Sequence, residues 1–218
     1  MKRTGKSIFK VCMCLLLAVT MLAATTQPVC ATTVSSQAKK AIKAYQKYLS
    51  GSKVKWDGGY STEDVPAERV SFSIVDINKD GIPELLLSSN YVSHAMGEQS
   101  ICIFNKGKVE FMGGDDYIKS YYPKSGIVEM YHCGMGNSTW YSKIKNGKDK
   151  TIASIEHNYG DPRKKKPTYY WENKQVTKAE FNKLLKKNAG TKKVKVTKSF
   201  WHKNTSSNRK SMLKMVKW

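Results

Sequence analysis

FSIVDINKDGIPELLL, residues 72–87, is the stretch of sequence that decides the fold. Apolar and polar residues alternate along residues 70–75, and residues 85–87 are three consecutive leucines. Such alternation and such a short apolar run are each typical of a β-strand. The residues between the two apolar segments are mostly polar and include the turn-formers Gly81 and Pro83. The stretch therefore predicts two strands joined by a polar loop.

The loop at residues 76–84 has the ligand spacing of a calcium-binding loop. Oxygen-bearing side chains occupy its positions 1, 3 and 5, a glycine occupies position 6, and an acid occupies position 9. Calcium takes six to eight oxygen ligands, and a glycine at position 6 permits the sharp turn that such a loop needs. We therefore expect calcium to be bound by the side chains of Asp76, Asn78 and Asp80, by the main-chain carbonyl of Ile82, and by Glu84 directly or through water.

This calcium loop is EF-hand-like in spacing but is not a helix–loop–helix EF-hand. An EF-hand needs a bidentate Glu at position 12, where this sequence has Leu87, and the flanking segments have strand patterns. Asn78 and Lys79 lower the negative charge of the loop, so we expect a weak, structural site with a dissociation constant on the order of 10⁻⁴–10⁻³ M. The alternative is an Asx-type turn that binds no metal.

On the N-terminal side of the calcium loop the sequence predicts a helix and then a loop. Apolar residues recur at helical spacing from Ala38 to Leu49, with Ser35 or Ser36 as the N-cap and Gly51 as the stop. Turn-forming and acidic residues are frequent between residues 57 and 66, where we expect an irregular loop.

On its C-terminal side the sequence predicts a series of short strands. They are expected near residues 100–104, 109–112, 127–131, 139–144 and 151–155. Asn105–Lys108 and Asn146-Gly147 are turn sequences between neighbouring strands. Short, evenly spaced strands favour an antiparallel β-meander over βαβ units.

After Gly160 the sequence alternates between strand and helix patterns. A strand at residues 169–171 precedes a capping box at Thr177–Glu180, which starts a helix that ends at Gly190. A further strand near residues 194–196 and a last helix from about residue 205 follow. The fold class is therefore α+β: an antiparallel β-meander with an N-terminal helix and a basic C-terminal helix–strand–helix segment. Residues 32–160 and 161–218 are expected to form one domain.

Residues 1–31 have the pattern of a cleavable export signal. A basic start is followed by an apolar run at residues 11–24, which is shorter than the roughly 20 residues that span a bilayer. Small residues before a cut after Ala31 suit signal peptidase, and an uncleaved anchor is the alternative. We expect an exported protein that is either released or retained at the cell surface, with no membrane-spanning segment after cleavage. Cys102 and Cys133 remain in the mature chain, as a disulfide or as two thiols.

Positive charge is concentrated in the last third of the chain. Residues 161–218 contain 18 Lys and Arg against 3 Asp and Glu, including the run Arg163–Lys166 beside aromatic residues 169–171. Such a segment attracts polyanions, and those available outside a cell are anionic cell-wall polymers, anionic glycans, extracellular DNA and lipid head groups. We expect anionic cell-wall polymers or glycans to be the partners. The alternative is a lysine-rich surface that serves solubility alone. Specific nucleic-acid recognition is not expected, because no known motif is present.

The chain resembles a group of exported proteins of Gram-positive gut anaerobes that carry a D-x-[DN]-x-D-G-x-x-E-L loop. The resemblance rests on residues 72–87, on the hairpin sequence Asn146–Lys148, and on the segments Val176–Asn182 and Asn204–Leu213. The calcium loop itself resembles the blade loops of integrin-type (VCBS or FG-GAP) propellers. The resemblance implies export and a fold of this kind, and it implies no particular activity.

Catalytic patterns are weak. The segment His132–Ser138 combines an imidazole, a thiol and glycines, but adjacent strand residues point to opposite faces, so His132 is poorly placed to activate Cys133. His157 could act as the base for this thiol only if the tertiary structure brought the two together. Four carboxylates could supply a glycosidase pair, and no spacing selects two of them: Asp115, Asp116, Glu129 and Glu156. We therefore expect a non-catalytic, calcium-stabilised module that attaches to the cell surface or to acidic polymers. The alternative is a secreted hydrolase acting on cell-wall or glycan material.

Overall fold

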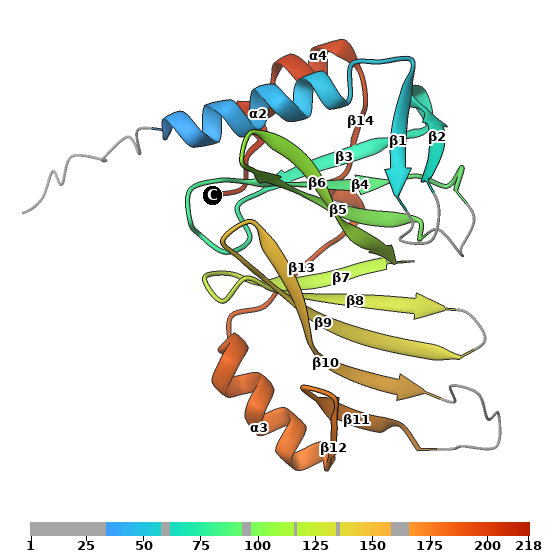
Figure 1. Ribbon diagram of the computed structural model, residues 1–218, viewed down its shortest axis with the longest axis vertical. Coiled ribbons are helices and arrows are strands. Elements are labelled where there is room, and N and C mark those ends of the chain that lie inside the picture. The colour runs from blue at the N-terminus through green and yellow to red at the C-terminus, as the bar shows by residue number, and fades with distance from the viewer. Residues whose placement is uncertain (1–33, 58–61, 93–96, 116, 134–135, 158–165) are drawn as a thin grey trace, which may run out of the picture. The chain divides into compact units, whose positions relative to one another are not determined.

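The computed structural model describes residues 34–57, 62–92, 97–115, 117–133, 136–157 and 166–218 (Figure 1). The chain divides into two compact units, Met1–Thr33 and Val34–Trp218. The predicted export signal, residues 1–31, lies outside the described residues. No helix in the described part of the chain is long and apolar enough to cross a membrane.

The α+β class is confirmed, because antiparallel sheets make up most of the described chain and a few helices accompany them. One sheet has five strands in the order β14-β3-β4-β5-β6. Their bounds are Ser71–Val75 (β3), Glu84–Ser88 (β4), Gln99–Asn105 (β5), Lys108–Asp115 (β6) and His202–Lys203 (β14). The strands β3 and β4 are the two that the sequence predicts on either side of the calcium loop.

The second large sheet has seven strands in the order β12-β11-β10-β9-β8-β7-β13. Their bounds are Tyr117–Tyr122 (β7), Ile127–Cys133 (β8), Asn137–Lys145 (β9), Lys148–His157 (β10), Thr168–Trp171 (β11), Lys174–Val176 (β12) and Val194–Lys195 (β13). The chain passes from one sheet to the other between β6 and β7, so the series of predicted strands is divided between two sheets.

A third, two-stranded sheet overlaps the segment, residues 57–66, that the sequence predicts as an irregular loop. Strands β1 (Lys53–Asp57) and β2 (Thr62–Pro66) pair antiparallel, so the loop prediction is wrong for residues 62–66. Burial of neighbouring apolar residues outweighs the low strand propensity of the acidic and turn-forming residues in this segment. Val54, Trp56 and Val65 are fully buried in the core, and their burial stabilises the hairpin.

Helix α2 (Ser36–Tyr48) covers the five-stranded sheet (Figure 1). The Ser35 hydroxyl, one of the two predicted caps, accepts a hydrogen bond of 3.0 Å from the amide of Ala38. The buried face of the helix, including Ile42 and Tyr45, packs in one hydrophobic cluster with Phe72 of β3. The short helices α4 (Ser206–Lys210) and α5 (Met212–Met215) replace the single last helix that the sequence predicts.

Helix α3 (Lys178–Ala189) covers part of the seven-stranded sheet through Phe181. The ring of Phe181 lies 5.3–6.0 Å, centroid to centroid, from the rings of Tyr141, Tyr169 and Trp171. Thr177 accepts a hydrogen bond from the amide of Glu180, as the capping box predicts.

The chain after α3 joins both large sheets. Strand β13 pairs with β7 of the seven-stranded sheet, and β14 pairs with β3 of the five-stranded sheet. A shared hydrophobic cluster contains Leu86 and Ile101 from one sheet, Val128 and Ile144 from the other, and Phe200 from the returning chain. No disulfide joins the two cysteines of the described chain, of which Cys102 is buried and Cys133 is exposed.

Candidate calcium site

The strand pair β3–β4 sets the position of the calcium loop. Val75 pairs with Glu84 at the open end of the pair, so the ends of the loop at residues 76–84 are held together. Asp76 is 3 % exposed and Glu84 is 4 % exposed. Asn78 and Ile82 are half-buried, and Asp80 is exposed. The five predicted ligand residues therefore lie in a turn whose two ends are buried and whose tip is open to solvent.

All four predicted side-chain ligands accept hydrogen bonds from amides of the loop itself. The amides of Gly81, Asp80, Ile82 and Ile77 donate, at 2.8–3.1 Å, to oxygens of Asp76, Asn78, Asp80 and Glu84 respectively. Lys79 and Gly81 have positive φ angles of 60° and 82°, which curl the chain around these oxygens. The loop is therefore an ordered Asx-type turn with its side-chain oxygens directed inward.

One buried carboxylate oxygen in this turn differs from the others in its hydrogen bonding. Asp76 Oδ2 accepts from the amide of Gly81, whereas Asp76 Oδ1 is buried and has no hydrogen-bond partner. A buried acceptor without a partner costs about 1–3 kcal/mol, and more when it is charged. Burial, and the nearby Asp80 carboxylate, raise the pKa of Asp76 above its ordinary value. Burial raises the pKa of Glu84 well above its ordinary value, and the carboxylates of Asp80 and Asp76 add to the effect.

A cation bound inside the loop would offset the cost of the unpartnered oxygen and the cost of ionising the two buried carboxyl groups. It would give Asp76 Oδ1 a partner, and it would favour the charged forms of Asp76 and Glu84. No group of three or more His, Cys, Asp or Glu residues that could hold a metal ion exists in the described part of the chain. The three carboxylates of the predicted set, Asp76, Asp80 and Glu84, therefore do not form such a group by themselves in this structure. The predicted site also relies on the Asn78 amide and the Ile82 carbonyl. Its donors are all oxygens, which suits calcium.

Both ends of the described chain hold this loop. The hydroxyl of Tyr45 in α2 donates to the carbonyl of Pro83 at 2.9 Å, and the hydroxyl of Ser35, the N-cap of α2, donates to the carbonyl of Gly81 at 3.3 Å. From the C-terminal side, Lys217 pairs with Val75 in a parallel bridge, and its carbonyl accepts from the amide of Asp76. The calcium loop is thus a point at which three distant segments of the chain meet.

Two surface hollows border the loop and share Asp80 and Asn146. The larger, of about 490 Å³, is lined by Ile82, Glu84 and residues of α2 and of the β5–β6 turn. The smaller, of about 340 Å³, is lined by Asn78 and by residues 124–125 and 143–145. The tip of the loop therefore faces concave surface on two sides.

The residues considered for catalysis are not brought together. Cys133 and His157 both lie opposite Asn137, on the strands to either side of it, so they are two strand spacings, about 10 Å, apart. Glu129 pairs with Tyr141 and Glu156 pairs with Ser138, and these alternate positions place the two carboxylates on opposite faces of the sheet. Asp116 and the side chain of Asp115 lie outside the described part of the structure.

Glu129 has a structural role that the sequence did not reveal. It is 5 % exposed, and its Oε2 lies 2.5 Å from the ammonium nitrogen of Lys193 and 2.6 Å from the hydroxyl oxygen of Ser120. The ammonium nitrogen of Lys119 lies 3.9 Å from Oε1. Burial raises the pKa of Glu129, but these partners together outweigh burial and hold the pKa below its ordinary value. The cluster ties the segment after α3 to the seven-stranded sheet.

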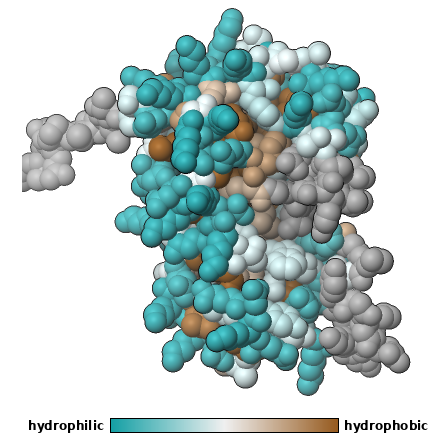
Figure 2. Space-filling model, in the orientation of Figure 1, coloured by the Kyte–Doolittle hydropathy of each residue, from teal (hydrophilic) through white to brown (hydrophobic). Residues whose placement is uncertain are grey.

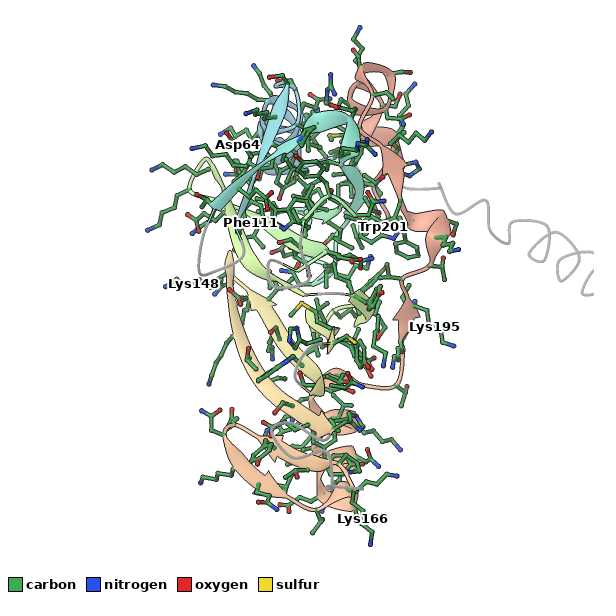
Figure 3. All side chains as sticks on the ribbon, turned by 90° about the vertical axis from the view of Figure 1, so that its right-hand side faces the viewer. Asp64, Phe111, Lys148, Lys166, Lys195 and Trp201 are labelled. Atoms are coloured by element: carbon green, nitrogen blue, oxygen red, sulfur yellow. The ribbon has the colours of Figure 1, made fainter. Side chains whose placement is uncertain are left out.

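Two basic residues of the last third lie far apart on the fold. Lys166 precedes β11 and Lys195 lies on β13, and Figure 3 shows these two well separated. Figure 2 shows hydrophilic residues over most of one face of the described chain. The start of the basic run, Arg163–Lys165, lies outside the described residues.

Comparison of the chain with protein-family models, with curated proteins and with solved structures found no match.

Proposed function

We propose that this protein is an exported, non-catalytic module that calcium stabilises and that attaches to the cell surface or to acidic polymers. The observation that carries the proposal is the buried Oδ1 of Asp76, which has no protein partner inside a loop of calcium-ligand spacing. A cation at this position would convert an unfavourable buried acceptor into a ligand. The export signal supports the proposal, because extracellular calcium is abundant enough for a weak site.

The position of the loop supports a stabilising role. Its contacts with α2 and with Lys217 connect segments that are far apart in the sequence. A ligand that binds only the folded loop stabilises the whole fold by mass action. Millimolar calcium is one to ten times the expected dissociation constant, which corresponds to about 0.4–1.4 kcal/mol. A calcium ion bound here would therefore act on global stability and not only on the loop.

The attachment part of the proposal is supported by charge. Without residues 1–31 the chain carries 34 Lys and Arg against 17 Asp and Glu. A protein with that excess associates with polyanions in a manner that weakens as salt rises. The hydrolase alternative has no comparable support, since Glu129 is engaged by Lys193 and Ser120 and lies on the opposite face from Glu156.

Thermal unfolding with and without calcium tests the proposal. We expect millimolar calcium to raise the melting temperature of the protein, and we expect Asp80→Ala to abolish that rise. Asp64→Ala is the matched control, because Asp64 is exposed on β2 and forms only a long 3.9 Å ion pair with Lys53. An unchanged melting temperature in millimolar calcium would refute the metal part of the proposal.

Binding and cleavage assays separate the two functions. The proposal predicts salt-sensitive binding to wall polymer that is unaffected by Cys133→Ala or Glu156→Gln. Hydrolysis of a wall or glycan substrate that is lost in either variant would establish the hydrolase instead.

A further inference from the structure

The surroundings of the calcium loop suggest what binds there besides calcium. The two hollows beside the loop are lined by five lysines. Lys40 of α2 and Lys106 of the β5–β6 turn line the larger hollow. Three more line the smaller hollow: Lys124, Lys143 and Lys145. The acidic residues that line them belong to the calcium loop itself, Asp80 to both hollows and Glu84 to the larger one.

This arrangement is unfavourable for a calcium ion on its own. Ammonium groups within a Debye length, about 8–10 Å in physiological salt, oppose the arrival of a second positive charge. Loops that bind calcium strongly gain affinity from the number of charged ligands. Here the loop contributes three carboxylates, and five lysines line the hollows beside it. The negative charge of an anion that entered the hollows would offset the positive charge of the lysines and favour calcium binding.

The expected coordination leaves room for that anion. The calcium loop offers five ligand residues, whereas calcium takes six to eight oxygens. If each residue gives one oxygen, at least one position is filled from outside the loop, by water or by an oxygen of another ligand. Asp80, Ile82 and Glu84 all line the larger hollow, so an outside oxygen could approach calcium from that hollow. Asn105 and Asn146 line it too and offer amide groups to a polar ligand.

We propose that the calcium loop and the lysine-lined hollows form one binding site for an anionic glycan polymer, in which a carboxylate or phosphodiester oxygen of the polymer completes the coordination of calcium. This inference rests on the proposed function, because it requires calcium in the loop. It goes beyond that function in placing polymer binding at this loop and not on the basic last third of the chain.

The proposal has a thermodynamic consequence. Coupling between two ligands is reciprocal, so a polymer that strengthens calcium binding must be bound more tightly, by the same factor, when calcium is present. Coupling between sites is typically 5–150-fold. We therefore expect a gain of about tenfold in each direction.

Titration calorimetry with two oligomers tests the proposal. An oligogalacturonate presents carboxylates, a glycerol phosphate oligomer presents phosphodiesters, and neutral dextran is the uncharged control. We expect at least one anionic oligomer to bind about tenfold more tightly in millimolar calcium than in EDTA, and the oligomer that does so identifies the oxyanion. Equal binding of the anionic oligomers in calcium and in EDTA would overturn the proposal. Dextran that bound as tightly as the anionic oligomers would overturn it too.

Charge-neutralising variants locate the site. The double variant Lys40→Gln/Lys106→Gln removes two ammonium groups from the larger hollow, and we expect it to lose most of the calcium-dependent affinity. The matched control is Lys43→Gln/Lys108→Gln, which changes the same helix and the same hairpin at exposed positions outside both hollows. Equal losses in the two double variants would overturn the proposal in favour of attachment by general surface charge.

The failure of this inference can be distinguished from that of the proposed function. A calcium-dependent rise in melting temperature without calcium-dependent oligomer binding contradicts only the shared site. No effect of calcium on either measurement contradicts both.

Discussion

The amide of Asp76 donates a hydrogen bond of 3.1 Å to the main-chain carbonyl of Lys217. Asp76 is the first residue of the calcium loop, and Lys217 is the penultimate residue of the sequence. The amide of Lys217 donates in turn to the carbonyl of Ile74, and its ammonium nitrogen lies 3.3 Å from the ring centroid of Phe200. The C-terminal residues therefore fix the backbone of the residue whose Oδ1 lacks a partner.

Deletion of residues 217 and 218 should weaken the response to calcium. The deletion leaves the amide of Asp76 without its acceptor in a buried setting, which costs about 1–3 kcal/mol. We expect a lower melting temperature and a smaller rise on adding calcium, measured by circular dichroism. Trp218→Ala is the control, since it keeps the backbone of Lys217 and removes a side chain that is about half exposed. A full calcium response in the deletion variant would contradict the prediction.

Asp76→Asn should have opposite effects with and without calcium. In the absence of metal, the new side-chain amide still offers an oxygen to the backbone N–H of Gly81. It carries no charge that must be buried, so we expect a gain in stability of about 1 kcal/mol. In millimolar calcium we expect the variant to be the less stable protein, because a charged ligand is lost. Urea unfolding in EDTA and in calcium measures both effects. If the variant and the wild type differed equally in the two conditions, the loop would be a turn without metal.

Glu129 should make the fold sensitive to acid. Burial raises the pKa of Glu129, but the contacts with Lys193, Ser120 and Lys119 together outweigh burial and hold the pKa in the folded protein below the ordinary value. A lowered folded pKa gives a contribution to stability that is complete above the pKa of the unfolded chain, about 4.3, and is lost as pH falls through the folded pKa. The free energy of unfolding should therefore decrease as the pH is lowered below about 4.3.

Glu129→Gln isolates this contribution. The variant removes the titrating group while it retains a polar side chain for Ser120, so its stability should vary less with pH between 5 and 3 than that of the wild type. Urea midpoints across this range measure the difference. Parallel curves for the two proteins would show that the Glu129 cluster does not titrate as proposed.

Gly126 and Gly107 form a matched pair of glycines. Both have positive φ angles, 69° and 83°. A Cβ atom at Gly107 would meet open space, whereas one at Gly126 would overlap the carbonyl oxygen of Ile144 and lie 3.0 Å from Cβ of Asn78. We expect Gly107→Ala to cost about 1–2 kcal/mol from its backbone conformation alone. Gly126→Ala should cost about 1–3 kcal/mol more, because a packed backbone must shift.

The same pair also tests the link between the seven-stranded sheet and the calcium loop. Because Gly126 approaches Asn78, Gly126→Ala should reduce the rise in melting temperature that calcium produces, and Gly107→Ala should leave it unchanged. Thermal unfolding of both variants in EDTA and calcium gives the answer. An identical calcium response in the two variants would show that the loop is independent of this contact.

The sequence by itself determined the local elements of this protein. Alternation along residues 70–75 and the three leucines at 85–87 predicted β3 and β4, and turn residues predicted the tip between β9 and β10 at Asn146-Gly147. Cap residues predicted the starts of α2 and α3. These features depend on contacts within a few residues, and such contacts leave a periodic or short-range pattern in the sequence. The ligand spacing of the calcium loop is a pattern of this local kind.

Only the tertiary structure decided how these elements combine. The division of the strands between two sheets, the ion pair of Lys193 with Glu129, and the contact of Lys217 with Asp76 all join segments far apart in the chain. No local pattern encodes such partners, because they are selected by which buried surfaces and charges fit together after the chain has folded. For the same reason, the sequence predicted which residues of the loop could bind calcium, and the fold alone buried Asp76 and placed five lysines along the two hollows beside the loop.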